Sequence, residues 1–107
     1  MATLNKDEYG QVVYAKMGED VSTATDYSFI LEPKRGTKQT KAVADGVALG
    51  TTNIYVNDEL HEANKYLTYT VKEGDLDVSG IWRKRGEATM SETNVVIGDY
   101  DLMSVLD

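Results

Sequence analysis

Short runs of alternating polarity cover most of the chain and predict β-strands. The clearest run is YSFILE at residues 27–32, where Tyr27, Phe29 and Leu31 share one face. A period of two residues is typical of a strand with one buried face, so we expect this run to form a central strand with its aromatic side inward. Pro33 is expected to end it, because proline cannot donate to a strand ladder.

Similar patterns predict the remaining strands. These lie at residues 11–15, 40–44, 47–49, 52–56, 66–71, 94–97 and 100–106, with a long strand that starts at 81. Asp45-Gly46 separates two of the short runs, and this dipeptide favours a tight type I′ hairpin turn. Because the flanking runs are short, a bulged corner within one bent strand is the competing interpretation.

The stretch from Tyr66 to Met90 has the densest β-type pattern. A run of Tyr, Thr, Leu and Val leads into an acidic corner at residues 73–77, and a second strand begins at Ile81-Trp82. Two strands joined as a hairpin are the natural interpretation, because β-branched and aromatic residues suit a half-buried sheet. Trp82, the single tryptophan, is expected to anchor the core, and Gly86 is expected to introduce a bulge.

Three segments fall outside this pattern. Residues 1–9 are polar and predict an N-terminal arm, so that the folded domain spans 10–107. Residues 21–26 are interpreted as a loop or a sheet edge. Residues 57–65 (NDELHEANK) are the best helix candidate, because Asn57 or Asp58 could cap a first turn rich in acids; an irregular crossing is the alternative.

Many short strands separated by turn signals, with at most one short helix, predict an all-β antiparallel sandwich or barrel of seven or eight strands. No sequence period repeats, which argues against a solenoid or propeller. A chain of 107 residues fits one domain with one core.

Composition and charge narrow the possible partners. The chain carries 18 acidic and 11 basic residues, for a net charge of -7, and this sign disfavours binding to nucleic-acid phosphates. No apolar run is long enough for a membrane-spanning helix, and the N-terminal ten residues do not resemble a secretory signal. The sequence has no cysteine, which excludes disulfides and thiolate metal sites.

The sequence contains no recognisable catalytic constellation. His61 is the single histidine, it lies among charged residues, and we interpret it as an exposed surface side chain. Neither a GxSxG nucleophile elbow nor a cysteine nucleophile is present. Most acids lie at turns, where aspartate is favoured for local hydrogen bonding. The sequence therefore predicts no catalytic residue, no cofactor and no enzyme activity.

Glu73, Asp75 and Asp77 are spaced at alternate positions, as oxygen ligands of calcium can be. They lack the DxDxDG frame and the distal glutamate of a known calcium loop, and Leu76 lies between two of them. The alternative is a solvated turn in which an aspartate caps a short 3₁₀ segment. The sequence leaves both interpretations open.

Basic residues gather in two places, and they give the candidate protein-binding surface. One group lies at 34–41 and the other at 83–85. Such residues often serve only to keep edge strands soluble, but they could also dock an acidic partner. Tyrosine is enriched at interfaces. The predicted interface residues are Tyr9, Lys34, Arg35, Arg83, Lys84 and Arg85.

The stretch 66–90 also resembles a known group of domains. The order of TYT, the acidic corner with Gly74-Asp75, the Gly80-Ile81-Trp82 step and a long outgoing strand resembles the Ig-like domains of tailed-bacteriophage virion proteins. The nearest pattern is the N-terminal domain of phage baseplate upper proteins, and residues 26–31 match its early strand in character. The resemblance covers about residues 20–90. The basic cluster at 83–85 departs from the family pattern.

This resemblance implies an Ig-like sandwich that is a non-enzymatic structural component of a phage virion, in the tail, neck or baseplate. It implies partners among other virion proteins and copies of itself, with neither nucleic acid nor membrane, and assembly in the host cytoplasm. The alternatives are a head decoration protein and a carbohydrate-binding or adhesin-like module.

Overall fold

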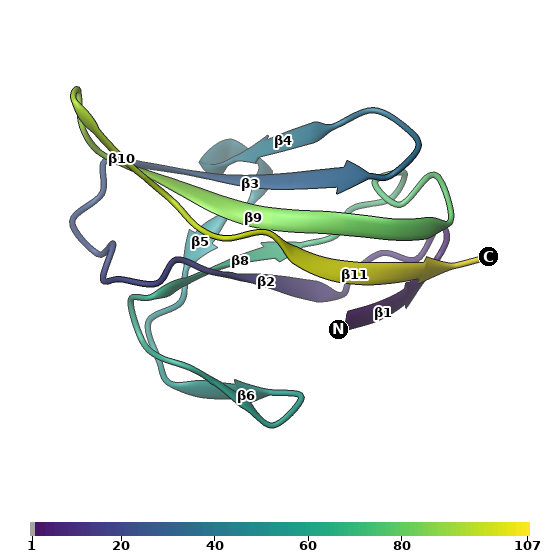
Figure 1. Cartoon of the computed structure of the whole chain (residues 1–107), viewed down its shortest axis with the longest axis horizontal. Helices are drawn as coiled ribbons and strands as arrows, with labels where there is room; N and C mark the ends of the chain where they lie inside the picture. The colour runs from purple at the N-terminus through teal and green to yellow at the C-terminus, as the bar shows by residue number, and fades with distance from the viewer. Residues whose placement is uncertain (1) are drawn as a thin grey trace.

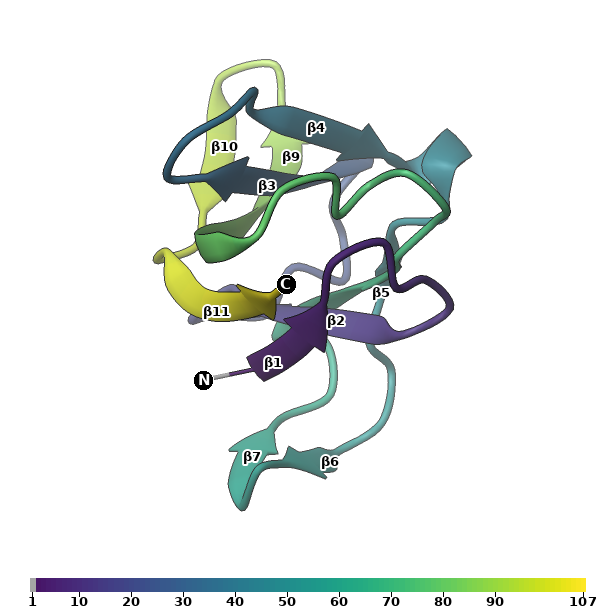
Figure 2. The same ribbon diagram turned by 90° about the vertical axis from the view of Figure 1, so that its right-hand side faces the viewer.

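The structure is a computed structural model that describes residues 2–107, and most of it is β-strand (Figure 1). Two sheets face each other across a hydrophobic core, and a small hairpin projects from them (Figure 2). The larger sheet has the order β1-β11-β9-β3-β4, and β10 also pairs with β9. Its strands are β1 (Ala2–Asn5), β3 (Asp26–Pro33), β4 (Gln39–Ala42), β9 (Gly80–Ser91), β10 (Asn94–Ile97) and β11 (Asp101–Leu106).

The smaller sheet has the order β2-β8-β5 and covers the inner face of the larger one. It contains β2 (Val12–Lys16), β5 (Ala48–Leu49) and β8 (Tyr66–Thr70), while β6 (Ile54–Val56) and β7 (Glu59–His61) form the separate hairpin. A single 3₁₀ turn, η1 (Val43–Asp45), is the helical element in residues 2–107. No helix in this range is long and apolar enough to cross a membrane.

The predicted all-β sandwich is confirmed. In an Ig-like domain, strands A, B, E and D form one sheet and strands G, F and C form the other, to which the variable type adds C′ and C″. The orders β2-β8-β5 and β11-β9-β3-β4 match B-E-D and G-F-C-C′, whereas β1 pairs with β11 and, within residues 2–107, the smaller sheet has no strand in the place of A. Residues 2–107 form eleven strand segments, more than the seven or eight predicted. β1 and β7 were expected to be an arm and part of a helix, and β4 and β5 are two separate strands.

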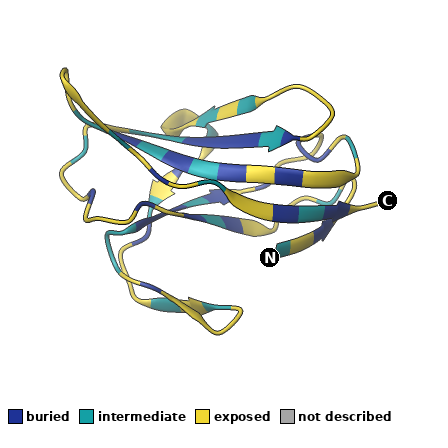
Figure 3. Cartoon of the chain, viewed as in Figure 1, coloured by how far each residue is buried: buried dark blue, intermediate teal, exposed yellow. Residues whose placement is uncertain are grey.

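β9 is the central strand of the larger sheet, and burial alternates along it (Figure 3). Trp82 is fully buried, as predicted, and its Nε1 donates to the carbonyl oxygen of Val78 at 3.0 Å. The predicted bulge at Gly86 is wrong, because β3 pairs with β9 in one unbroken register. A Cβ at Gly86 would lie 2.6 Å from Sδ of Met17 and 2.8 Å from Cδ1 of Leu67, so glycine lets the two sheets approach closely.

The hairpin predicted for residues 66–90 is also wrong. β8 pairs with β2 and β5, whereas β9 pairs with β3, β10 and β11. The acidic stretch at 73–77 therefore carries the chain from one sheet to the other, as a connection in a Greek-key sandwich does. Strand propensity identified both strands, but it contains no information on which strand pairs with which.

Asp45-Gly46 does not form a two-residue hairpin turn. Asp45 ends η1, and Gly46 follows with φ of 102° in the left-handed region, which glycine adopts without steric cost. The strands on either side, β4 and β5, belong to different sheets. The segment is a corner between sheets, which is closer to the competing interpretation than to the hairpin.

The N-terminal arm was predicted for residues 1–9, of which Met1 lies outside the described residues. For residues 2–5 the prediction is wrong, because they form a strand of the larger sheet. β1 pairs in parallel with β11, with Leu4 opposite Val105. The Leu4 side chain is buried in the core. The short ATLN segment did not indicate this strand locally, because its partner lies about 100 positions away in the sequence.

The helix predicted at residues 57–65 is absent. Asn57 and Asp58 have φ of 51° and 64°, the left-handed values that a type I′ turn requires at both central positions. They join β6 to β7, with Val56 paired to Glu59. The residues interpreted as a helix cap are therefore a hairpin turn, because asparagine and aspartate suit both roles.

Candidate protein-binding surface

Strand alternation divides the basic cluster at 83–85. Arg83 and Arg85 lie on the outer face of the larger sheet, whereas Lys84 points inward and is only 4 % exposed. Successive side chains of a strand point to opposite faces, so three consecutive bases cannot share one surface. Lys84 is thereby removed from the predicted surface, and Arg83 and Arg85 remain on it.

Tyr100 contacts both arginines. The guanidinium carbon of Arg83 is 4.1 Å from the centre of the Tyr100 ring, and that of Arg85 is 4.5 Å away. Both distances are within the range of a cation–π contact. Glu32 on β3 accepts from Nε of Arg83 at 2.5 Å, and Glu87 lies 3.7 Å from Nη2 of Arg85. Arg83 is thus bonded to Glu32 and packed on the Tyr100 ring, whereas Arg85 contacts the ring and has a longer ion pair with Glu87.

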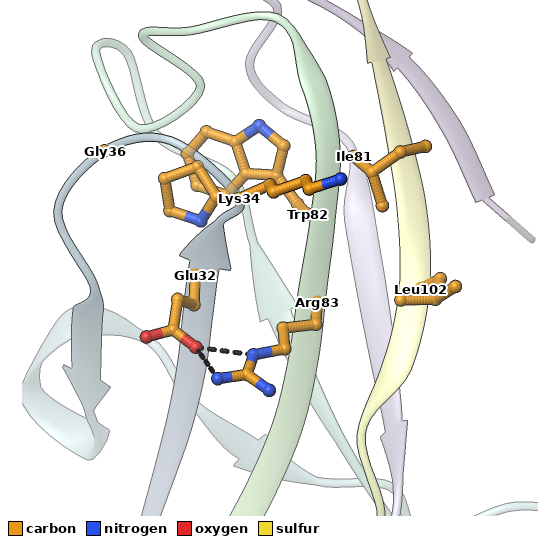
Figure 4. Close-up of a pocket in the computed structure, with 8 residues that line it drawn as sticks. Glu32, Lys34, Gly36, Ile81, Trp82, Arg83 and Leu102 are labelled. Atoms are coloured by element: carbon orange, nitrogen blue, oxygen red, sulfur yellow. Dashed lines mark hydrogen bonds and ion pairs between the residues drawn. The ribbon is translucent and has the colours of Figure 1, made fainter.

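A hollow of about 440 Å³ adjoins this group at one end of the sheet (Figure 4). Ile81 on β9 and Leu102 on β11 line it, and both remain about half exposed. Lys34 lies on its rim, together with the Glu32–Arg83 ion pair seen in Figure 4. Its lining residues are Glu32, Pro33, Lys34, Gly36, Ile81, Trp82, Arg83 and Leu102. The hollow combines apolar walls with a charged rim.

The structure brings together some of the predicted interface residues and separates others. Lys34 and Arg83 line the same hollow, and Arg35 is exposed beside Lys34 in the β3–β4 loop. Tyr9 is exposed in the β1–β2 loop and does not line this hollow. Ile81, Tyr100 and Leu102 were not among the predicted interface residues. Strand alternation from the buried Trp82 and Met103 could have placed Ile81 and Leu102 on the outer face.

Lys84 connects the two sheets. Its Nζ lies 2.8 Å from Oδ2 of Asp101 and also donates to the main-chain oxygen of Tyr14 on β2. Burial alone would raise the pKa of Asp101, but the bond and the positive charge of Lys84 outweigh it and hold this pKa below its usual value. Lys84 therefore has a structural position at the margin of the core.

His61 is buried, contrary to the prediction of an exposed side chain. Its ring packs edge-on against Tyr14 and Tyr66, with both pairs of ring centres 5.7 Å apart. Nδ1 lies 3.2 Å from the main-chain oxygen of Glu59. A charged sequence neighbourhood suggested exposure, but strand alternation in β7 turns His61 toward the body of the domain. His61 therefore packs the hairpin against the smaller sheet.

The acidic corner is not uniformly solvated. Asp75 is buried, and its carboxylate accepts from Nζ of Lys41 at 2.8 Å, the Tyr69 hydroxyl at 2.5 Å and the Lys72 amide at 2.8 Å. Glu73 and Asp77 are exposed. Within residues 2–107, no three or more side chains of His, Asp or Glu converge in a metal-binding arrangement. The carboxylate of Asp75 is committed to internal donors.

The described residues of the surface can therefore offer apolar, aromatic and cationic contacts on one face of the larger sheet. The sequence matches no protein-family model. No curated protein matches it either.

Proposed function

We propose that this chain is a non-enzymatic structural component of a bacteriophage virion, in the tail, neck or baseplate, and that it assembles through protein–protein contacts. Its partners would be other virion proteins and copies of itself. The resemblance of residues 20–90 to Ig-like virion domains supports the virion part of the proposal. The outer face of the larger sheet supports the binding part.

The observation that carries the binding proposal is the Arg83–Tyr100–Arg85 group beside exposed Ile81 and Leu102. Arginine and tyrosine are enriched in protein interfaces and among their hot-spot residues. Arg83, which is already bonded to Glu32, loses less conformational freedom on binding than a free side chain would. A partner would meet a prearranged surface with an apolar margin.

The carbohydrate-binding alternative has less support. A sugar platform needs an aromatic face that is open beside polar groups, and the ring of Tyr100 already contacts two guanidinium groups. Tyr9 and Tyr55 are exposed, but they lie on different elements and do not line the hollow. Glycan-array binding by the purified domain would favour this alternative.

Mass spectrometry of purified particles tests the virion proposal. Particles from a host that produces this chain should contain it in a fixed ratio to the other structural proteins, and fractionation into heads and tails would give its place. Recovery with the heads would favour the decoration alternative. Absence from all particles would overturn the proposal.

Charge reversal tests the binding surface separately. The double change Arg83→Glu and Arg85→Glu should abolish incorporation into particles, because both cationic contacts with Tyr100 are replaced by acids. Lys72→Glu, a reversal at an exposed position in the β8–β9 connection, is the control. Normal incorporation of the double variant would remove this face from the proposal.

A further inference from the structure

The β6–β7 hairpin projects from the body of the sandwich (Figures 1 and 2). Tyr55 and Leu60 form a cross-strand pair within it, and they are 74 % and 39 % exposed. Directly opposed residues share one face of a two-stranded ribbon. The hairpin therefore presents an aromatic and an aliphatic side chain together, away from the core.

Several contacts hold this hairpin in place, although an isolated hairpin is only marginally stable. His61 packs between Tyr14 and Tyr66 at its base, and Glu59 lies 2.6 Å from Nζ of Lys16. Asn53 accepts from the Ala63 amide at 2.8 Å. Because the hairpin is held by these contacts, Tyr55 and Leu60 lose less conformational entropy on binding than the same residues on a flexible loop would.

The hairpin and the hollow are complementary in charge. Residues 53–62 contain Asp58, Glu59 and Glu62 and have no lysine or arginine. Glu59 is paired with Lys16 and Glu62 with Lys65, so among the described residues Asp58 is the hairpin acid that can meet the bases of a partner. The rim of the hollow carries Lys34 and Arg83, and the adjoining loop adds further bases at 35 and 38. Glu32 is the acid on this rim and is bonded to Arg83. Opposed charges of this kind favour encounter and fix orientation.

They are also complementary in chemistry. Ile81, Leu102 and Pro33 give the hollow apolar walls, and its volume of about 440 Å³ lies within the roughly 300–1,000 Å³ of ligand pockets. Tyr55 and Leu60 are apolar groups of the kind that such a hollow would bury. Aromatic anchors seated in pockets provide most of the binding energy in many interfaces.

We propose that the hairpin of one copy inserts Tyr55 and Leu60 into the hollow of a second copy of this chain. The inference rests on the proposed function, because it names the self-contact in that assembly. The hollow is lined by residues of the larger sheet, on β3, β9 and β11, and of the loop after β3. The hairpin lies in the connection between β5 and β8 of the smaller sheet. Each copy therefore has one donor and one acceptor on different parts, and such head-to-tail contacts build rings or filaments.

Two complementary variants test the contact. Tyr55→Ser removes the inserted ring but keeps the hollow, and Leu102→Glu places an acid in the hollow but keeps the hairpin. Both residues are exposed, so both variants should fold. In sedimentation velocity, the wild type should form oligomers that grow with concentration. Each variant alone should associate about tenfold or more weakly, as expected for loss of a hot spot.

An equimolar mixture of the two variants is the decisive measurement. It retains one intact hairpin and one intact hollow, so it should form a one-to-one dimer and nothing larger. Val43→Ser, at an exposed apolar position on η1, is the control and should behave as the wild type. A mixture that stays monomeric, or a monomeric wild type, would overturn the inference.

A change of charge gives an independent check. Asp58→Asn, which suits the left-handed turn position, and Lys34→Glu should each weaken association. Wild-type oligomers that persist in Tyr55→Ser and in Leu102→Glu would overturn the insertion but leave the proposed virion role. Absence of the chain from particles would remove that role and leave the contact between copies standing.

Discussion

Tyr69 and Asp75 are joined by a hydrogen bond of 2.5 Å between the phenol oxygen and Oδ2. Tyr69 belongs to β8 in the smaller sheet, and Asp75 lies in the connection that leads to β9. Lys41, on β4 of the larger sheet, reaches the other oxygen of the same carboxylate. One buried carboxylate therefore ties the crossing segment to both sheets and closes this end of the sandwich.

Asp75→Asn should destabilise the domain by several kcal/mol. The change leaves the Lys41 amine without its carboxylate in a largely buried site, and breaking a buried pair in this way costs about 3–5 kcal/mol. Asp77→Asn, an exposed change two residues later, should be nearly neutral. Urea unfolding followed by tryptophan fluorescence measures both. Equal stability of the two variants would contradict the role given to Asp75.

Stability should fall in acid, with Asp75 among the causes. Burial would raise the pKa of Asp75, but the bonds from Lys41, Tyr69 and the Lys72 amide outweigh it and lower this pKa. A carboxyl with a lowered folded-state pKa stabilises the fold above its unfolded value of about 3.9, and this contribution is lost as the pH falls through the folded-state value. Unfolding curves measured between about pH 6 and pH 2.5 should show a shallower loss for Asp75→Asn than for the wild type. Parallel curves would refute the assignment.

Lys84→Met should destabilise the domain although methionine suits a buried site. The main-chain oxygen of Tyr14 would lose its charged donor, and an unsatisfied buried acceptor costs about 1–3 kcal/mol. Asp101 is mostly exposed and can turn to solvent. The unfolding temperature of Lys84→Met is compared with that of the wild type. Lys72→Met, the same change at an exposed lysine, is the matched control. A gain in stability would mean that the lysine serves something other than the fold.

Gly98→Ala should be more damaging than Gly86→Ala. A Cβ at Gly98 would overlap the main-chain oxygen of Lys16, which cannot move without shifting β2. The corresponding neighbours of Gly86 are the ends of the Met17 and Leu67 side chains, which can adjust. Overpacking of a core typically costs about 1–3 kcal/mol. In chemical denaturation, Gly98→Ala should lose more free energy of unfolding than Gly86→Ala. The reverse order would contradict this packing.

Local patterns predicted the strands but not their partners. Alternation around Phe29 and the burial of Trp82 were predictable, because both follow from side-chain period and size. The parallel pairing of β1 with β11 and the separation of β8 from β9 were not predictable, because they depend on contacts between distant segments.

The candidate surface was predictable only in part. A cluster of bases in the sequence indicated residues 83–85, but only the strand register shows that Lys84 faces the interior while Arg83 and Arg85 contact Tyr100. His61 was missed for a related reason. Its burial depends on a type I′ turn at Asn57-Asp58, and the same residues also suit a helix cap.

The parallel pairing of β1 with β11 has a mechanical consequence. Ala2 lies opposite Met103 and Asn5 opposite Leu106, so the start of β1 and the end of β11 are at opposite ends of the paired segment. Traction that draws these two points apart acts along both strands and shears the hydrogen bonds between them. Those bonds then share the load and do not open one at a time. A domain connected to its neighbours through these two points would resist stretching.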